Sequence, residues 1–248
     1  MTSTTERFAF KIAVAKLPRG EPLGVAQLGK HGVTAFRASS LARSGWLVHL
    51  ARGVYMLPGD TLMRDGCLAF LSARISGFHV GSKTALDWRG VRHNVSFREV
   101  LNLWGNDRKP LPSWFTERFE SRYQVTQLFD ERLKKGFGLQ PLPNGRPEVL
   151  VSVPERALLE LLSDVGKNQS FDEAQQLVEA LRSLRTKVLD ELMTHVTRIK
   201  VIRLAESLSR ELDLPWVALA KRHSQRMGGG KRWVGVSKSG ERLDLRRS

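Results

Sequence analysis

The sequence predicts an α+β fold with two domains, a small one at residues 1–60 and a larger mixed one at residues 61–248. Three observations lead to this prediction: the length of 248 residues, the hydrophobic content of 41%, and a change in the order of predicted elements near residue 60. A chain of this length and composition can bury a hydrophobic core and is long enough for one or two domains. Its single cysteine, Cys67, excludes an internal disulfide and is expected to be a small buried hydrophobic residue.

The first sixty residues are expected to form three helices and a β-hairpin. Apolar residues at helical spacing cover Arg7–Leu17, Val25–Lys30 and Ala35–Ser44. Thr34 is a good N-cap for the third helix, and the short link before it is typical of a helix-turn-helix. Five apolar residues are placed to fill the core between the second and third helices: Val25, Leu28, Val33, Ala38 and Leu41.

The hairpin decides the subtype of this domain. Two β-favouring runs, Trp46–Leu50 and Val54–Leu57, flank a turn that carries Arg52. A helix-turn-helix followed by such a hairpin is a winged helix, whose third helix enters the major groove of DNA while the hairpin contacts the backbone or the minor groove. The sequence therefore predicts a winged helix-turn-helix DNA-binding domain at residues 1–60.

The outer arc of the third helix supplies the candidate DNA-reading residues. Arg37 is the natural candidate for a bidentate contact to guanine, because its planar guanidinium matches two acceptors of that base. Ser and Thr hydroxyls can contact bases or phosphates, and the cations around the helix are better placed for phosphates. For each residue alone, an ordinary solvated side chain is the alternative. The candidate DNA-binding residues are Lys30, His31, Thr34, Arg37, Ser39, Ser40, Arg43 and Arg52.

The net charge of +15 favours a polyanionic partner, nucleic acid first. Residues 1–60 carry +5 and residues 221–248 carry +7, whereas the 160 residues between them carry only +3. In the C-terminal segment, cationic residues stand on both sides of a glycine run, and a predicted strand with an alternating residue pattern follows them. We expect a second polyanion contact here, to DNA or RNA; an edge strand whose charges oppose aggregation is the alternative. The residues of this second basic surface are Lys221, Arg222, Arg226, Lys231 and Arg232.

Beyond residue 60 the predicted elements form a mixed α/β pattern. Helical spacing covers Leu62–Ile75 and Gly81–Trp88, the latter with Ser82 as its N-cap. Strands are predicted over Glu99–Trp104, Ser121–Leu128 and Glu148–Val153.

The second half of this domain is predicted to be rich in helices. Ser152–Glu155 and Ser170–Glu173 have the spacing of capping boxes, in which two side chains bond each other's backbone N–H groups. Glu155 is accordingly interpreted as part of a cap and Glu160 as a solvated helix position. The helices are expected to run through Leu162, to end near Leu181, and to cover Lys187–Met193 and Arg198–Leu212.

No motif in the sequence is typical of an enzyme. The six histidines lack metal-binding spacing, and one cysteine cannot build a Cys-rich zinc site. Gly228–Lys231 resembles the end of a phosphate-binding loop, but Gln225 stands where that loop needs glycine and Arg232 where it needs Ser or Thr. We expect no catalytic residue, no cofactor and no metal site. Neither end carries an apolar stretch of signal-peptide or membrane-spanning length, which predicts a cytoplasmic protein without a membrane partner.

Several short motifs, in order along nearly the whole chain, match one known family. The two most specific are Arg52–Tyr55 in the hairpin and Pro154–Leu159 in a helix, the latter within a longer match over Val153–Glu160. The others are Gly45–Val48, Gly81–Gly90, Val201–Leu208, Pro215–Trp216, Gly228–Arg232 and Arg242–Asp244. In these motifs the sequence resembles the AbiEi-type antitoxins of type IV toxin–antitoxin and phage abortive-infection systems.

The resemblance implies two roles. The winged helix would repress its own operon by binding inverted repeats of operator DNA, and the C-terminal antitoxin domain would neutralise a nucleotidyltransferase-like toxin without needing a stable complex with it. The third helix is richer in Ser and Ala than the Arg-rich helix expected of the family, so no operator sequence can be carried over. The residues leave two alternatives open: a stand-alone winged-helix regulator with a sensing or dimerisation domain, and an RNA-binding accessory protein.

Overall fold

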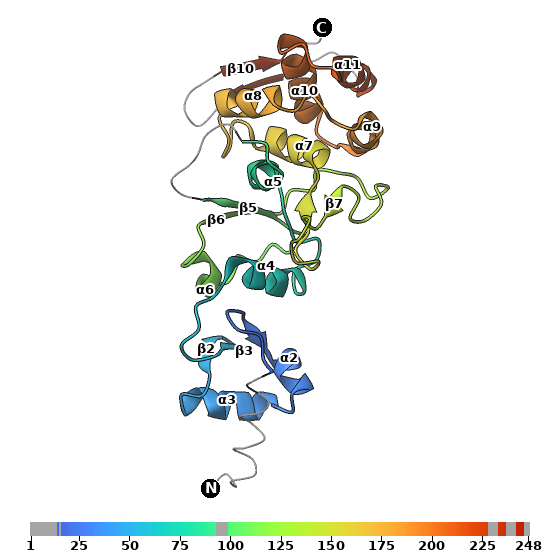
Figure 1. Cartoon of the computed structure of the whole chain (residues 1–248). Coiled ribbons are helices and arrows are strands. Elements are labelled where there is room, and N and C mark those ends of the chain that lie inside the picture. Colours follow the sequence, from blue (N-terminus) through green and yellow to red (C-terminus); the bar gives the residue numbers. More distant parts are fainter. Residues whose placement is uncertain (1–13, 15, 93–98, 228–232, 237–241, 246–248) are drawn as a thin grey trace. The chain divides into compact units, whose positions relative to one another are not determined.

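The computed structural model describes residues 14, 16–92, 99–227, 233–236 and 242–245 (Figure 1). The chain divides into two compact units. Unit 1 comprises Met1–Arg74 and Pro110–Phe119, and unit 2 comprises Ile75–Lys109 and Glu120–Ser248. Most of the predicted first helix, Arg7–Leu17, lies outside the described residues. The domain division at residue 60 stays a prediction.

Unit 1 contains the predicted winged helix. Its helices are α2 (Val25–Lys30) and α3 (Ala35–Arg43), and its three strands form one antiparallel sheet in the order β1-β3-β2. The strands are β1 (Leu23–Gly24), β2 (Val48–Ala51) and β3 (Val54–Met56). The Thr34 hydroxyl accepts a hydrogen bond from the Arg37 backbone N–H at 3.2 Å, which confirms the predicted N-cap of α3.

The hairpin of the wing turns at Arg52 and Gly53. Gly53 has a φ of +72°, a conformation that glycine adopts without the steric cost that a Cβ brings, so the turn can stay tight. The core of the winged helix is formed by residues that lie between positions 14 and 57 of the chain. Its buried residues are Leu17, Leu23, Leu28, Val33, Ala38, Leu47, Tyr55 and Leu57, with Val14, Val25, Leu41 and Ala42 packed against them.

Among its described residues, unit 1 also contains two further helices: α4 (Arg64–Ser72), which is shorter than predicted, and α6 (Ser113–Thr116). The Phe70 and Trp114 rings meet edge to face at 5.8 Å and join the two helices. Cys67 on α4 is fully buried, and this burial raises the pKa of its thiol to about 12. Cys67 is thus the buried hydrophobic residue that the sequence predicts.

Unit 2 is built on a mixed five-stranded sheet in the order β6-β5-β4-β8-β7. Its pairs β5–β6 and β4–β8 are parallel, whereas β4–β5 and β7–β8 are antiparallel. The observed strands are shorter than the predicted ones. They are β4 (His79–Val80), β5 (Leu101–Trp104), β6 (Ser121–Gln124), β7 (Leu139–Gln140) and β8 (Val151–Ser152).

The described part of unit 2 also contains the antiparallel strand pair β9 (Trp233–Val236) and β10 (Arg242–Leu245), together with six helices. The helices are α5 (Ser82–Trp88), α7 (Pro154–Asp164), α8 (Phe171–Glu179), α9 (Thr186–His195), α10 (Ile199–Glu211) and α11 (Val217–Arg226). The leucines of α7 and α10 form much of the core, because Leu158, Leu159, Leu161, Leu162, Leu204 and Leu208 are fully buried.

Three local predictions in unit 2 are wrong. The cap of α5 is Gly81, not Ser82. The N-cap of α7 is Val153 without a side-chain hydrogen bond, so Ser152–Glu155 is not a capping box. Glu160 is fully buried rather than solvated. Only the second box keeps its cap, since the Ser170 hydroxyl accepts from the Glu173 N–H at 3.3 Å.

Candidate nucleic-acid interface

Residues 22–59 of the winged helix are cationic because they contain no acidic residue. No Asp or Glu stands between Glu21 and Asp60, whereas the same stretch contains Lys30, Arg37, Arg43 and Arg52. With no carboxylate on α2, α3 or the hairpin, these cations are not neutralised from within their own elements. Such a surface attracts phosphate groups.

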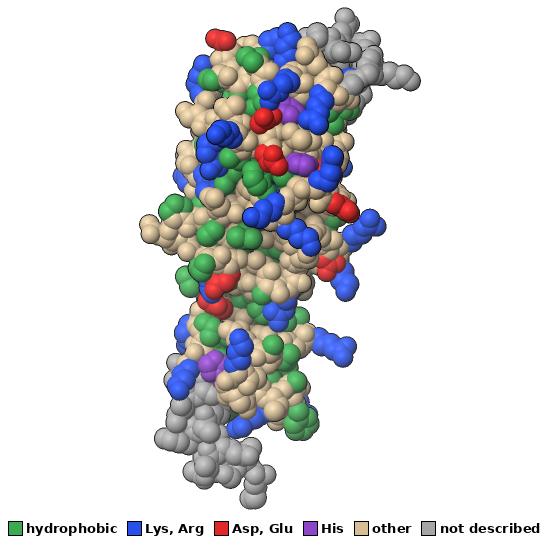
Figure 2. Space-filling model, turned by 90° about the vertical axis from the view of Figure 1, so that its right-hand side faces the viewer, with side chains coloured by type: hydrophobic (Ala, Val, Ile, Leu, Met, Phe, Trp, Pro, Cys, Tyr) green, Lys and Arg blue, Asp and Glu red, His purple; other side chains and the backbone are tan. Residues whose placement is uncertain are grey.

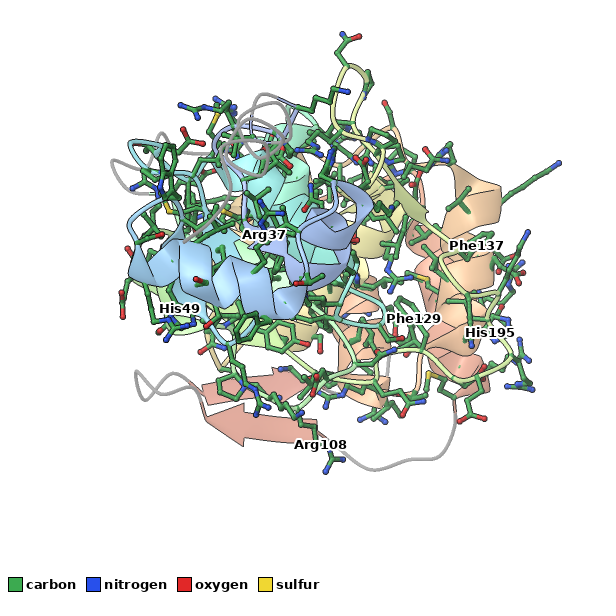
Figure 3. The ribbon with its side chains drawn as sticks, turned by 90° about the horizontal axis from the view of Figure 1, so that it is seen from below. Arg37, His49, Arg108, Phe129, Phe137 and His195 are labelled. Carbon is green, nitrogen blue, oxygen red and sulfur yellow. The ribbon has the colours of Figure 1, made fainter. Side chains whose placement is uncertain are left out.

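The predicted DNA-binding residues lie on α2 and α3, in the turn between these helices, and at the turn of the hairpin. Lys30 ends α2, His31 follows it, Thr34 caps α3, and Arg52 stands at the hairpin turn. The side chains of Lys30, Thr34, Ser39, Ser40, Arg43 and Arg52 are exposed, and those of His31 and Arg37 are half-buried. Figure 3 labels Arg37 on α3 and His49 on β2. All eight therefore have side-chain surface that a ligand can reach.

The outer side of α3 also carries a residue that the sequence analysis missed. Phe36 is 81% exposed, although Ala38 two positions later is fully buried. Residues 36, 40 and 43 are spaced i, i+4 and i+7, so Phe36, Ser40 and Arg43 lie on one stripe of the helix. The same helical periodicity, applied to the sequence, was the signal that could have placed Phe36 opposite the core.

The wing presents a mixed surface beside Arg52. His49 on β2 contacts the Tyr55 ring edge to face at 5.6 Å, and Val48 is 40% exposed. Trp46, just before the strand, is 50% exposed. The observed hairpin strands begin at Val48 and Val54, so the predicted strand over Trp46–Leu50 starts two residues too early.

Two family models together match nearly the whole chain. Residues 98–245 match the model described as "Transcriptional regulator, AbiEi antitoxin, Type IV TA system", and residues 7–97 match "Transcriptional regulator, AbiEi antitoxin N-terminal domain". The chain belongs to the AbiEi antitoxin family. The resemblance found in its motifs is confirmed, and this AbiEi protein is a transcriptional-regulator antitoxin of the type IV toxin–antitoxin class.

Comparison with solved structures supports the fold. The crystal structure of the RV2827C protein from Mycobacterium tuberculosis is similar, with a TM-score of 0.56 and 14% sequence identity over 92% of this chain and 82% of that one. At this identity the likeness concerns the fold alone. A search of curated proteins finds no match to this sequence.

Three residues of the predicted second basic surface lie on α11, a helix that the sequence did not predict. Lys221, Arg222 and Arg226 are exposed on α11, while Lys231 and Arg232 lie outside the described residues. Arg222 donates to Asp190 at 2.7 Å. On the face that Figure 2 shows, Lys and Arg side chains spread over the region of α9 and α11, with acidic and His side chains between them. The charge of this helix is thus partly neutralised within unit 2.

The Val153–Glu160 motif forms part of a buried ionic network. Both oxygens of Glu160 accept hydrogen bonds: Oε1 from Arg156 Nε at 2.8 Å and from His79 Nε2 at 2.9 Å, and Oε2 from the Ser152 hydroxyl at 2.8 Å and from the Ser82 N–H at 3.0 Å. Burial alone would raise the pKa of Glu160, but the charges and hydrogen bonds of His79 and Arg156 hold it at about 2. This arrangement fastens α7 to β4, β8 and α5 and holds no open site.

Glu155 of the same motif is also structural. It is 2% exposed, and its carboxylate accepts from the Arg185 backbone N–H at 2.8 Å and from the Arg185 guanidinium at 2.8 and 2.9 Å. Arg185 is the N-cap residue of α9. The two glutamates of the motif therefore tie α7 to separate parts of unit 2.

The described residues also bear on two other kinds of site, metal centres and membrane-spanning helices. Within that part of the chain, no three or more His, Cys, Asp and Glu side chains come together as metal ligands would. None of the helices in the described ranges is both long enough and apolar enough to cross a bilayer.

Proposed function

We propose that this AbiEi protein represses its own operon by binding inverted repeats in its operator DNA and neutralises a nucleotidyltransferase-like toxin. The observation that carries the DNA-binding part is the winged helix without an acidic residue between Glu21 and Asp60. Its exposed cations and hydroxyls come from α2, α3 and the hairpin, the elements that a winged helix turns toward DNA.

The residues divide by the contact that each is suited to make. Arg37 reads a guanine in the major groove, and Thr34, Ser39 and Ser40 supply hydroxyls to bases or phosphates. The cations Lys30, His31, Arg43 and Arg52 contact phosphates, which fix the register of the protein on the duplex.

Neutralisation of the toxin belongs to the domain at residues 61–248. This part of the chain has its own core in α7 and α10, separate from the core within residues 14–57. The toxin is a functional partner that need not be held in a stable complex. The second basic surface, Lys221, Arg222, Arg226, Lys231 and Arg232, makes a further contact to a polyanion.

The DNA-binding part is tested by gel shift of the full chain on the DNA directly upstream of its own gene. The protein is expected to shift this DNA at lower concentration than a scrambled duplex. Arg43→Ala should weaken the shift, whereas Arg108→Ala, which removes an exposed arginine of unit 2, should leave it unchanged. Equal shifts on both duplexes would refute operator recognition.

The antitoxin part is tested by expression with the neighbouring gene. A nucleotidyltransferase gene directly downstream should stop growth when expressed alone, and growth should return when the AbiEi protein is produced with it. The rescue should persist without residues 1–60. Failure of the full chain to rescue, with normal amounts of protein, would contradict neutralisation.

A further inference from the structure

The outer surface of α3 carries an exposed apolar side chain, Phe36. Of the large hydrophobic residues exposed in the described part of the chain, Phe36 has the highest exposed fraction, 81%, followed by Met63 at 66%. Leaving a phenylalanine in water forgoes the stabilisation that burial would give. The core of the winged helix does not include Phe36.

The position of Phe36 on the helix points it away from the protein. Ala38 is fully buried and faces the core, and a step of two residues turns about 200° around a helix. Phe36 therefore lies opposite the buried side, on the same stripe as Ser40 and Arg43. It also stands in the first turn of α3, just after the Thr34 cap. In a helix-turn-helix, the N-terminal residues of the second helix contact base edges.

The charges around Phe36 favour DNA over a second copy of the chain. Arg37 is adjacent, Arg43 shares its stripe, and neither α2 nor α3 contains an acidic residue. Pairing this face with its own copy would bring like charges together, which costs binding free energy. A DNA major groove offers the opposite charge together with one apolar group, the C5-methyl of thymine.

We propose that Phe36 packs against a thymine C5-methyl group in the operator and so specifies thymine at that position. The inference rests on the proposed DNA binding and adds a base-reading residue to it. Phenylalanine is among the side chains that make apolar contact with this methyl group. Arg37 and Phe36 would then read adjacent features of the groove, one by hydrogen bonds and the other by removing a methyl group from water.

The test removes the methyl group from the DNA and the ring from the protein, separately and together. Operator duplexes from the DNA upstream of the gene are made with deoxyuridine in place of thymidine, one position at a time. Replacement of the contacted thymine should weaken wild-type binding about fourfold, the equivalent of burying one methyl-sized group. Phe36→Ala should bind the thymidine duplex about tenfold more weakly and lose its sensitivity to deoxyuridine at that position.

Two variants serve as controls. Phe36→Leu keeps an apolar side chain and should retain the methyl sensitivity. Val125→Ala removes another exposed apolar side chain, 43% exposed and in unit 2, and should bind both duplexes like the wild type. Circular dichroism and thermal unfolding should show Phe36→Ala folded as the wild type is, because the ring is exposed.

Each possible result excludes a particular interpretation of Phe36. Equal losses from deoxyuridine in the wild type and Phe36→Ala at every position would overturn the methyl contact while leaving operator binding intact. A change in oligomeric state by sedimentation with unchanged methyl sensitivity would make Phe36 a self-association residue and also overturn it. Failure of the wild type to recognise its upstream DNA would refute the proposed function itself, and the inference with it.

Discussion

The buried carboxylate of Glu160 gives the sharpest prediction of stability. It accepts hydrogen bonds from four donors, which belong to His79, Arg156, Ser82 and Ser152. Glu160→Gln keeps the size of the side chain but replaces one acceptor oxygen with an NH2 group. Whichever way the amide turns, this group faces donors, and the positive charge of Arg156 loses its partner.

The magnitude follows from two independent arguments. The pKa of Glu160 is about 2 against an ordinary value of 4.5, because His79 and Arg156 outweigh the effect of burial, and about 1.4 kcal/mol per pKa unit gives about 3 kcal/mol. Removing one partner of a buried ion pair costs about 3–5 kcal/mol. The lowered pKa also sets the pH dependence: this stabilisation is complete above pH 4.5 and is lost as the pH falls toward 2.

The measurement is urea unfolding of the full chain at neutral pH. Glu160→Gln should lower the free energy of unfolding of unit 2 by about 3–5 kcal/mol. Tryptophan fluorescence is a suitable probe, since Trp104 stacks on His79 with ring centroids 6.4 Å apart. Glu179→Gln, at an exposed residue of α8, should change stability by less than about 0.5 kcal/mol. A loss no larger than that of Glu179→Gln would refute an ionised Glu160 as the anchor of this network.

Three other predictions follow. Arg37→Ala should cost about 1–3 kcal/mol of operator affinity and relax the preference at one base pair. Arg52→Ala should weaken binding to all DNA sequences alike and reduce by about one the slope of the logarithm of the binding constant against the logarithm of the salt concentration. Equal losses of affinity for operator and random DNA in both variants would contradict the assigned roles. Burial raises the pKa of Asp164 from 3.8 to about 6 and makes its ionised form unfavourable in the folded state. Asp164→Asn should therefore stabilise the protein by up to about 3 kcal/mol above pH 6 and have little effect below pH 4. Thermal unfolding of both proteins across this pH range checks the prediction, and a stability difference that does not change with pH would argue against it. Lys221→Glu with Arg226→Glu should reduce toxin rescue or operator affinity in a protein that still folds; if neither changes, α11 carries only solvated charge.

Local rules in the sequence predicted the winged helix well. The Thr34 cap, the bounds of α2 and the hairpin turn at Gly53 each depend on residues within a few positions of one another. Such interactions are encoded in short stretches, so composition and spacing are enough to predict them. The same rules predicted Arg43 of α3 and Arg52 of the wing to be exposed, and both are exposed, whereas Arg37 is half-buried.

Contacts between distant residues could not be predicted in this way. Glu160 was interpreted as solvated because its partner His79 lies 81 positions away along the chain. Glu155 had the spacing of a capping residue, but Arg185 takes its carboxylate from 30 positions away. A carboxylate surrounded by leucines was nevertheless a warning, because a helix buried on most sides leaves little room for a solvated position.

Unit 1 is formed by two separate segments of the chain, because Pro110–Phe119 belongs to it although Ile75–Lys109 belongs to unit 2. The winged-helix core is complete once residue 57 has left the ribosome, whereas the packing of α4 on α6 must wait for residue 115 or so. The DNA-binding element can therefore fold during synthesis well before the unit that holds it is finished. A chimaera that exchanges only residues 1–74 between relatives would pair α4 with the α6 of another protein. An exchange of the whole of unit 1 must therefore include both Met1–Arg74 and Pro110–Phe119.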